Sequence, residues 1–237
     1  MLKKLNLNFY YFWKTSWTTI SIFWCIYFSF ICLTLILAIS FNNSSISMSG
    51  INVVPAVIFC LIFGLNFFKD SFPHLIKLGL DRYSFLLSIF IYMIAFAVVM
   101  TVISQVSSWI IKALTTVFQL DNFSYISMVD LMQNGFNQWE IFLYEFFLYL
   151  LFFGLAILIG SIFFRFGQKI GFTLLAILPA LFIIKPVGLQ FVKIINYIAV
   201  DNPQYHIPSL LSLSVIIGLF LWLTVSKASV IDKTISK

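Results

Sequence analysis

Charged residues are scarce in this sequence. Asp, Glu, Lys and Arg make up 9% of its 237 residues, whereas 62% are apolar and 19% are aromatic. A soluble domain is about 45–50% apolar and about 25% charged, so a globule of this size could not hide so much Phe, Ile and Leu from water. These proportions exclude a soluble enzyme, a nucleic-acid-binding protein and a secreted disulfide scaffold. They predict a chain whose solvent is the lipid bilayer.

Groups that carry catalysis or bind metals are also few. The three cysteines, Cys25, Cys32 and Cys60, lie within apolar stretches, and we expect them to be small buried side chains rather than metal ligands. His74 and His206 are the only histidines, and no HExxH or GxSxG motif is present. None of the ten glycines begins a phosphate loop of the form GxxxxGKS or GxxxxGKT. We therefore expect no enzyme activity, no catalytic residue and no bound cofactor or metal in this chain by itself.

Long charge-free windows predict an all-α fold with six membrane spans. A helix needs about 20 apolar residues to cross a hydrocarbon core of about 30 Å. The polar segment 42–50 divides the first long window into two spans. The predicted spans are residues 16–41, 51–68, 84–111, 140–164, 170–184 and 207–226 of a single permease-like domain. The third window ends in Ser104, Gln105, Ser107 and Ser108, so we expect this helix to project beyond the bilayer.

The residues before the first span have their own pattern. Apolar residues recur there at helical spacing beside lysines, at Leu2, Leu5, Phe9 and Phe12. This pattern predicts a short helix over residues 2–14 that lies in the inner membrane interface. The long apolar stretch that follows lacks a small-x-small cleavage site, which favours an uncleaved first span over a signal peptide.

The positive charges fall unevenly on the two sides that six spans create. With an inside N-terminus, eleven cations lie inside and three outside. The inside group is Lys3, Lys4, Lys14, Lys69, Lys77, Arg82, Arg165, Lys169, Lys227, Lys233 and Lys237, and the outside group is Lys112, Lys185 and Lys193. Cytoplasmic loops are enriched in Lys and Arg, so both termini are predicted to be cytoplasmic. Trp13 and Trp17 then fall near the inner interface, and Trp109 and Trp139 near the outer one, as in an aromatic belt.

The predicted inner loop between spans two and three contains the signals of a separate short helix. Asp70 or Ser71 can cap it, and Pro73 suits its first turn. Its apolar face consists of Phe72, Leu75, Ile76 and Leu78. Gly79 is expected to end this helix with a left-handed residue, and Asp81 to cap the third span. A helix of this kind either contacts a soluble partner or lies on the membrane surface.

This loop resembles the inner loop of small permease subunits from bacterial ATP-binding-cassette exporters of the type-2 class. In that family a helix between spans two and three is followed by a Gly-x-Ser-Arg-like turn, and this chain has Gly79-Leu80-Asp81-Arg82. Aspartate in place of serine keeps a capping residue. The resemblance extends over the layout of nearly the whole chain: an interfacial N-terminal helix, six spans with inside termini and no nucleotide site. The family also carries a re-entrant outer hairpin before its last span. Here residues 185–206 follow a fifth span of only fifteen residues, about 22 Å at 1.5 Å per residue.

The resemblance implies a function for the chain in a bacterial cytoplasmic membrane. Two permeases, identical or paired with a sister, would enclose the path of an amphipathic or hydrophobic substrate such as a peptide, an antimicrobial peptide, a lipid or a drug. ATP and Mg would be bound by separate cytoplasmic ATPase subunits. The small size and the richness in Phe and Ile look most like peptide-export or antimicrobial-immunity permeases of Gram-positive bacteria. The residues that would contact the ATPase are Ser71, Phe72, Pro73, His74, Leu75, Ile76, Lys77, Leu78, Gly79, Leu80, Asp81 and Arg82.

Other interpretations stay open on the residues alone. A non-transporting membrane scaffold or assembly factor would have the same low charge within its spans. A channel or a secondary carrier would usually place several ionisable groups there, whereas only Glu145 lies within a predicted span. Glu145 is either a carboxylate at the wet outer end of its helix or a polar point on a substrate path.

Overall fold

The computed structural model describes residues 2–40, 48–77, 79, 81–120, 123–126, 137–167, 171–173, 189–190, 193 and 206–226. The long helices in these ranges are α1 (Leu2–Ser40), α2 (Val53–Lys77), α3 (Arg82–Val117), α5 (Gln138–Phe166) and α8 (His206–Ser226). Each of the five is long and apolar enough to cross a membrane. The prediction of an all-α membrane protein with several spans is confirmed for these helices. The predicted span 170–184 and the predicted hairpin 185–206 lie, apart from short pieces, outside the described residues.

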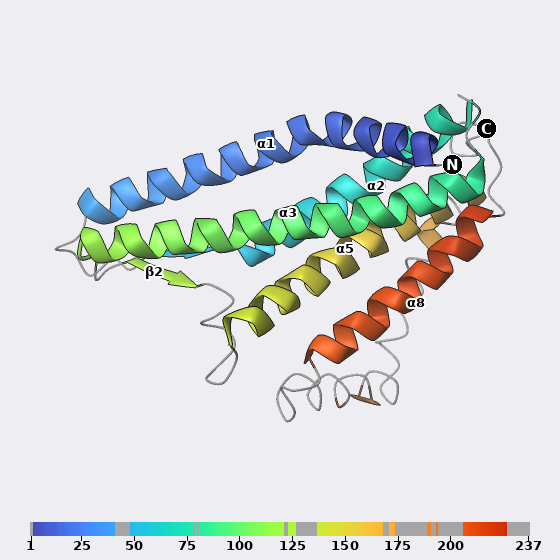
Figure 1. The fold of residues 1–237 in the computed structure, drawn as a ribbon. Coiled ribbons are helices and arrows are strands. Elements are labelled where there is room, and N and C mark those ends of the chain that lie inside the picture. The colour runs from blue at the N-terminus through green and yellow to red at the C-terminus, as the bar shows by residue number, and fades with distance from the viewer. Residues whose placement is uncertain are drawn as a thin grey trace.

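The five helices form an elongated bundle with two distinct ends (Figure 1). At one end lie the beginnings of α1 and α3 and the last turns of α2, α5 and α8. There the guanidinium of Arg82 donates to the carbonyl oxygen of Ser226 at 3.3 Å, and that of Arg165 donates to the carbonyl oxygen of Thr224 at 3.4 Å. We call this the basic end, because seven cations lie toward it, whereas Lys112 lies toward the opposite end of α3; the seven are Lys3, Lys4, Lys14, Lys69, Lys77, Arg82 and Arg165.

The opposite end carries two short strands, β1 (Met48–Ile51) and β2 (Phe123–Ile126), and we call it the strand end. The strands pair in parallel, with Gly50 opposite Tyr125. α1 and α3 reach further than the other helices at this end (Figure 1). Sequence analysis predicted only a polar turn at 42–50 and did not predict the strand pair.

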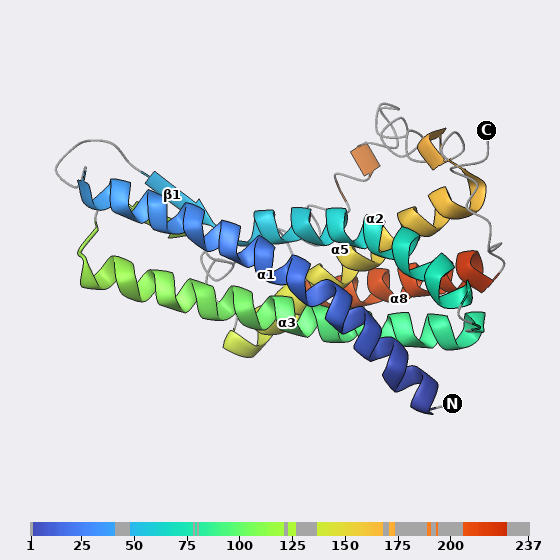
Figure 2. The same cartoon turned by 90° about the horizontal axis from the view of Figure 1, so that it is seen from above.

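Aromatic side chains form the core where the helices meet. α5 packs against α2, α3 and α8, while α1 crosses over α3 (Figure 2). The rings of Phe96 and Phe153 stack with centroids 4.2 Å apart, and those of Phe67 and Tyr92 at 4.9 Å. Aromatic pairs in such geometries contribute about 0.5–1.5 kcal/mol each beyond the area that they bury. The many Phe side chains therefore pack the helices against one another, and they also suit an apolar lipid environment.

The predicted separate interfacial helix over residues 2–14 is wrong. These residues are the first turns of α1, which runs without interruption for 39 residues. Asn8 is buried and donates to the hydroxyl of Ser88 on α3 at 3.1 Å, and the ring of Phe12 lies 5.0 Å from that of Phe67. Phe9 and Phe12 of the predicted apolar stripe instead pack against the bundle.

The predicted separate helix over residues 71–78 is also wrong. α2 continues through Pro73 to Lys77, so neither Asp70 nor Ser71 begins a new helix. A proline inside a helix costs about 3 kcal/mol, because it removes one backbone hydrogen bond and crowds the preceding turn. Burial of Phe72 offsets this cost: its ring contacts those of Phe85 and Phe164 at 5.1 and 5.3 Å.

The turn between α2 and α3 has the predicted chemistry. Gly79 has a φ of +85°, a left-handed conformation that disfavours other residues. Asp81 caps α3 by accepting from the backbone N–H of Ser84 at 3.0 Å and from its hydroxyl at 2.7 Å. Both expectations for this turn are confirmed.

Asp81→Ala is expected to lower the free energy of unfolding by about 1 kcal/mol, since the first turn of α3 loses its capping acceptor. Unfolding by sodium dodecyl sulfate from dodecylmaltoside micelles measures the change. Asp70→Ala is the matched control. Asp70 is an exposed acid on α2, about two turns before the end of that helix, and it caps no helix. Equal effects of the two substitutions would show that the cap does not stabilise α3.

The cysteine prediction holds for one residue only. Cys60 is buried between helices, but Cys25 and Cys32 are exposed on α1. Both exposed cysteines lie among apolar residues such as Ile22, Ile26 and Phe30, which form the outer face of α1. A small apolar side chain suits a lipid-facing surface as well as a core, so the sequence pattern alone did not distinguish a buried cysteine from a lipid-facing one.

Candidate functional site

The one carboxylate within a predicted span lies inside the protein. Glu145 is on the second turn of α5 from the strand end, and its side chain is only 1% exposed. The side chains of Ser104 and Gln105 on α3 are its hydrogen-bonding neighbours. Glu145 is thus enclosed between α3 and α5 rather than placed at a wet helix end. Buried ionisable groups in membrane spans are costly and mark functional positions.

Around Glu145 is a buried polar cluster, which consists of Asn52, Ser104, Gln105, Ser108, Glu145 and Tyr149. Asn52, just before α2, donates from its amide to the Ser104 hydroxyl and to the Ser108 hydroxyl, both at 2.8 Å. It also approaches the Ser104 carbonyl oxygen at 3.1 Å. The phenol of Tyr149, one turn along α5 from Glu145, donates to the Ser104 hydroxyl at 3.1 Å. The cluster therefore ties α2, α3 and α5 together near the strand end.

Two oxygen atoms of the polar cluster have no hydrogen-bond partner. They are Oδ1 of Asn52 and Oε2 of Glu145, and both are buried. Both atoms are acceptors. A buried polar atom without a partner in a membrane costs several kcal/mol, so the cluster has unmet capacity for a hydrogen-bond donor. Water, a proton or a cationic group fits this chemistry, whereas an anion does not.

The polar residues at the end of the third predicted span lie inside the protein. α3 is indeed longer than a bilayer requires, at 36 residues or about 54 Å. Its Ser104, Gln105, Ser107 and Ser108 are nevertheless buried against the other elements, not projecting into water. Ser and Gln at i, i+3 and i+4 share one helix face, and this spacing could have indicated an internal polar stripe.

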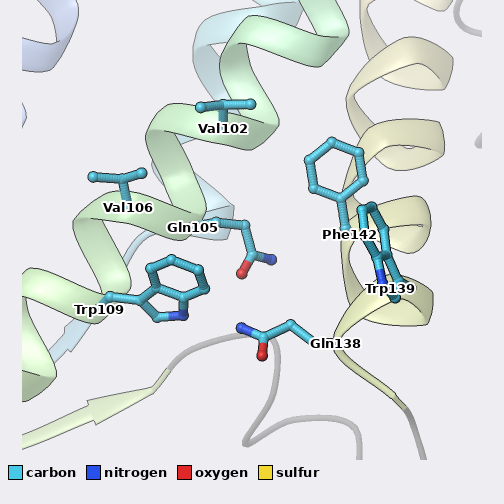
Figure 3. Close-up of a pocket in the computed structure, with 7 residues that line it drawn as sticks. All are labelled: Val102, Gln105, Val106, Trp109, Gln138, Trp139 and Phe142. Atoms are coloured by element: carbon cyan, nitrogen blue, oxygen red, sulfur yellow. The ribbon is translucent and has the colours of Figure 1, made fainter.

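An aromatic groove opens beside the polar cluster. It lies between α3 and α5 and has a volume of about 470 Å³, within the usual range for small-molecule sites. We call it the α3–α5 groove, lined by Val102, Gln105, Val106, Trp109, Gln138, Trp139 and Phe142. Figure 3 shows the amides of Gln105 and Gln138 pointing toward one another between the two helices. Gln105 belongs to both features and connects the groove with Glu145.

The strand pair closes the polar cluster from the side of α1. The phenol oxygens of Tyr27 on α1 and Tyr125 on β2 are 3.1 Å apart. Burial raises the pKa of the Tyr125 phenol above its usual value, so the group stays protonated. Tyr125 also interacts with the hydroxyls of Ser107 and Ser108. Residues from β2 thus complete the enclosure, which sequence analysis missed because β2 itself was not predicted.

The residues proposed for an ATPase contact lie far away, at the basic end. Ser71, Phe72 and Leu75 are buried in the bundle, so they offer little surface to a partner. Pro73 and Ile76 are partly exposed, whereas His74, Lys77, Gly79, Asp81 and Arg82 are exposed, and Leu78 and Leu80 lie outside the described residues. The exposed group forms the tip of the bundle between α2 and α3.

In the described part of the chain, no three His, Cys, Asp or Glu side chains are grouped so that they could hold a metal ion. His74 is on the last turns of α2 at the basic end, where its ring stacks on that of Tyr11 at 5.3 Å. His206 begins α8 near the strand end. The groups that the described site offers to a ligand are buried acceptors and aromatic walls.

The described helices have the length and composition of a multi-pass membrane protein. Compared with models of protein families, with curated proteins and with solved structures, the chain gives no match.

Proposed function

We propose that this chain is the transmembrane permease subunit of an ATP-binding-cassette exporter in the cytoplasmic membrane of a bacterium. Two permeases, identical or sister chains, would enclose the path of an amphipathic or hydrophobic substrate. Separate ATPase subunits would bind ATP and Mg in the cytoplasm and drive the cycle. The chain itself would hydrolyse nothing, and its polar cluster would lie next to the substrate path.

The exposed tip at the basic end is the observation that supports this function best. It is a short turn between two long helices, and both sides of it are rigidly held. Phe72 anchors the last turns of α2 among Phe85 and Phe164, while Asp81 caps α3. A force applied at this tip would therefore move α2 and α3 as rods and reach the polar cluster at their other ends. A flexible connecting loop would not transmit such a movement.

The charges support the orientation that this function requires. Seven cations of the five long helices lie toward the basic end, and Lys112 lies toward the strand end. Under the positive-inside bias the basic end is cytoplasmic. The tip would then face the ATPase, and the α3–α5 groove would lie toward the outer leaflet.

Co-purification with the ATPase tests the proposal. The chain is co-expressed with the ATP-binding-cassette ATPase encoded beside it and captured through a tag on its own N-terminus. We expect the ATPase to co-purify, and the substitution Lys77→Glu to reduce its yield at least tenfold. The Lys77 side chain is exposed at the tip, so the reversal of charge acts on the contact and not on the core.

Lys69→Glu is the matched control. It makes the same change of charge on the same helix, two turns before the tip, on an exposed side chain. We expect this variant to retain the ATPase. Absence of the ATPase from the wild-type preparation, or equal yields from the tip variant and the control, would refute docking at the tip and favour a non-transporting scaffold.

A further inference from the structure

The α3–α5 groove has apolar walls and one polar end. On α3, Val102, Val106 and Trp109 recur at helical spacing, and on α5 Trp139 and Phe142 face them (Figure 3). Trp109 and Trp139 are 57% and 76% exposed, so a large part of each indole is accessible from outside the bundle. Apolar walls that carry an indole on each side suit an alkyl chain or another slender apolar segment.

The polar end of the groove leads to the unpaired carboxylate. Gln105 lines the groove and also neighbours Glu145. Glu145 follows Phe142 by three residues on α5, so it lies on the same side of the helix, one turn deeper. Its Oε2 has no hydrogen-bond partner, although the side chain is 1% exposed. Gln105 is therefore the residue that joins the groove to the carboxylate.

The sign of the charge restricts the ligand. Within the described chain, the side chains of Ser104 and Gln105 form hydrogen bonds with Glu145, the phenols of Tyr125 and Tyr149 lie close enough to interact with it, and no Lys, Arg or His forms an ion pair with it. Both unpaired oxygens of the polar cluster are acceptors, on Asn52 and Glu145. A ligand that satisfies them must bring hydrogen-bond donors and preferably positive charge. A primary ammonium supplies three donors and one charge.

We propose that the α3–α5 groove binds an amphiphile with a primary ammonium group, its apolar segment between Trp109 and Trp139 and its ammonium at Gln105 and Glu145. The amide of Gln105 accepts from the ammonium at the end of the groove, and the Glu145 carboxylate balances its charge. An aminolipid headgroup and an amine of an amphipathic peptide share this chemistry. This inference rests on the proposed function in one respect: the groove would be the place where an exported molecule binds. Binding of the amphiphile itself needs no ATPase.

Quenching of tryptophan fluorescence by 12-bromododecylammonium tests the site, because bromine quenches an indole that it contacts. The whole chain is placed in phosphatidylcholine nanodiscs without any ATPase. We expect a saturable component above the linear background from the bilayer. The anionic analogue 12-bromododecanoate partitions into the same bilayer and should give the linear background only. Because no ATPase is present, failure of docking at the tip leaves this result unaffected.

Glu145→Gln keeps the shape of the side chain and removes its charge, so we expect at least a tenfold weaker affinity for the ammonium probe. Glu140→Gln is the matched control: Glu140 is one turn away and accepts from the backbone N–H of Asn137 at 2.8 Å, a contact that glutamine can keep. This variant should bind as the wild type does. Unchanged affinity in Glu145→Gln, or equal losses in both variants, would overturn the proposal. If Glu145→Gln does not fold, the wild-type comparison decides, and equal saturable quenching by cation and anion refutes the site.

Two further arms identify the source of the ammonium. Replacing half of the phosphatidylcholine by phosphatidylethanolamine weakens the apparent affinity of the probe if an aminolipid occupies the groove. An amphipathic peptide of lysine and leucine competes with the probe in pure phosphatidylcholine if the groove takes a peptide amine. Competition in either arm supports the site and assigns its natural ligand class, whereas a probe that no amine displaces overturns it.

Discussion

Gly64→Leu is expected to lower the free energy of unfolding by about 3 kcal/mol or to prevent folding, because it forces α2 and α5 apart. A Cβ at Gly64 would lie 2.6 Å from the Cβ of Ala156 and 3.0 Å from the carbonyl oxygen of Phe153. Gly160, one turn beyond Ala156 on α5, also leaves little room: its Cβ would lie 3.0 Å from the carbonyl oxygen of Leu65. Small residues that let two backbones approach closely are a main source of helix association in membranes.

Smaller substitutions separate this clash from other effects of replacing glycine. Gly218→Ala on α8 is the control, since its Cβ would meet nothing closer than a ring carbon of Phe90 at 3.4 Å. Both alanines gain helix propensity, so only Gly64→Ala should lose stability in detergent unfolding experiments. Adding Ala156→Gly should restore part of the loss by removing the nearest atom. If Gly64→Ala is as stable as Gly218→Ala, the two helices do not cross as closely as described.

The membrane spans could be predicted from the sequence because the bilayer imposes a simple condition on each segment separately. A stretch of about 20 residues without charge is sufficient evidence for a span. The charge-free windows accordingly match α3, α5 and α8 to within about six residues at each end. They also match α1 and α2, except that α1 begins earlier and α2 ends later than the predicted spans. The cap at Asp81 and the left-handed Gly79 were predictable for a similar reason, since each depends on a few adjacent residues.

The continuity of α1 and α2 depends on distant contacts and was missed. A capping residue, a proline and an amphipathic stripe suggested helix ends near Ser71 and Trp13. The structure extends both helices because partners on other helices bury the side chains concerned, as Phe85 and Phe164 bury Phe72. A capping residue contributes about 1 kcal/mol and the proline costs about 3 kcal/mol, and burial of aromatic side chains against neighbouring helices can offset such costs.

The candidate site was predictable only in part. Glu145 could be singled out because it is the one carboxylate within a span. Its enclosure depends on Ser104 and Gln105, about 40 residues earlier in the sequence, and on an asparagine some 90 residues earlier. Such pairings leave no trace in the periodicity of either segment. The groove has the same origin, since Trp109 and Trp139 suggested only an aromatic belt until α3 and α5 were placed side by side.

Asn52→Asp is expected to be the most damaging single change in the polar cluster, with a loss of about 3–5 kcal/mol from an uncompensated buried charge. The amide of Asn52 donates to the hydroxyls of Ser104 and Ser108 and approaches the Ser104 carbonyl oxygen. A carboxylate of the same shape removes these donors and sets negative oxygen against a carbonyl oxygen. It also adds a second negative charge to the cluster that contains Glu145. The loss should shrink as the pH is lowered, because a carboxyl that takes up a proton is neutral and can donate again.

Asn66→Asp provides the matched control for this prediction. Asn66 is on α2, the helix that Asn52 precedes, but it is exposed, and its amide donates to the carbonyl oxygen of Ile62 one turn back, at 3.0 Å. The same exchange of amide for carboxylate there should cost less than 1 kcal/mol, since water solvates the new charge. Unfolding is measured in dodecylmaltoside micelles at pH 7.5 and at pH 5, and the comparison distinguishes the two sites. The lower pH is on the order of one unit above an ordinary aspartate pKa. If both variants lose equal stability at both pH values, Asn52 does not hold α2 against α3, and the enclosure of Glu145 must depend on α5 and Tyr149 alone.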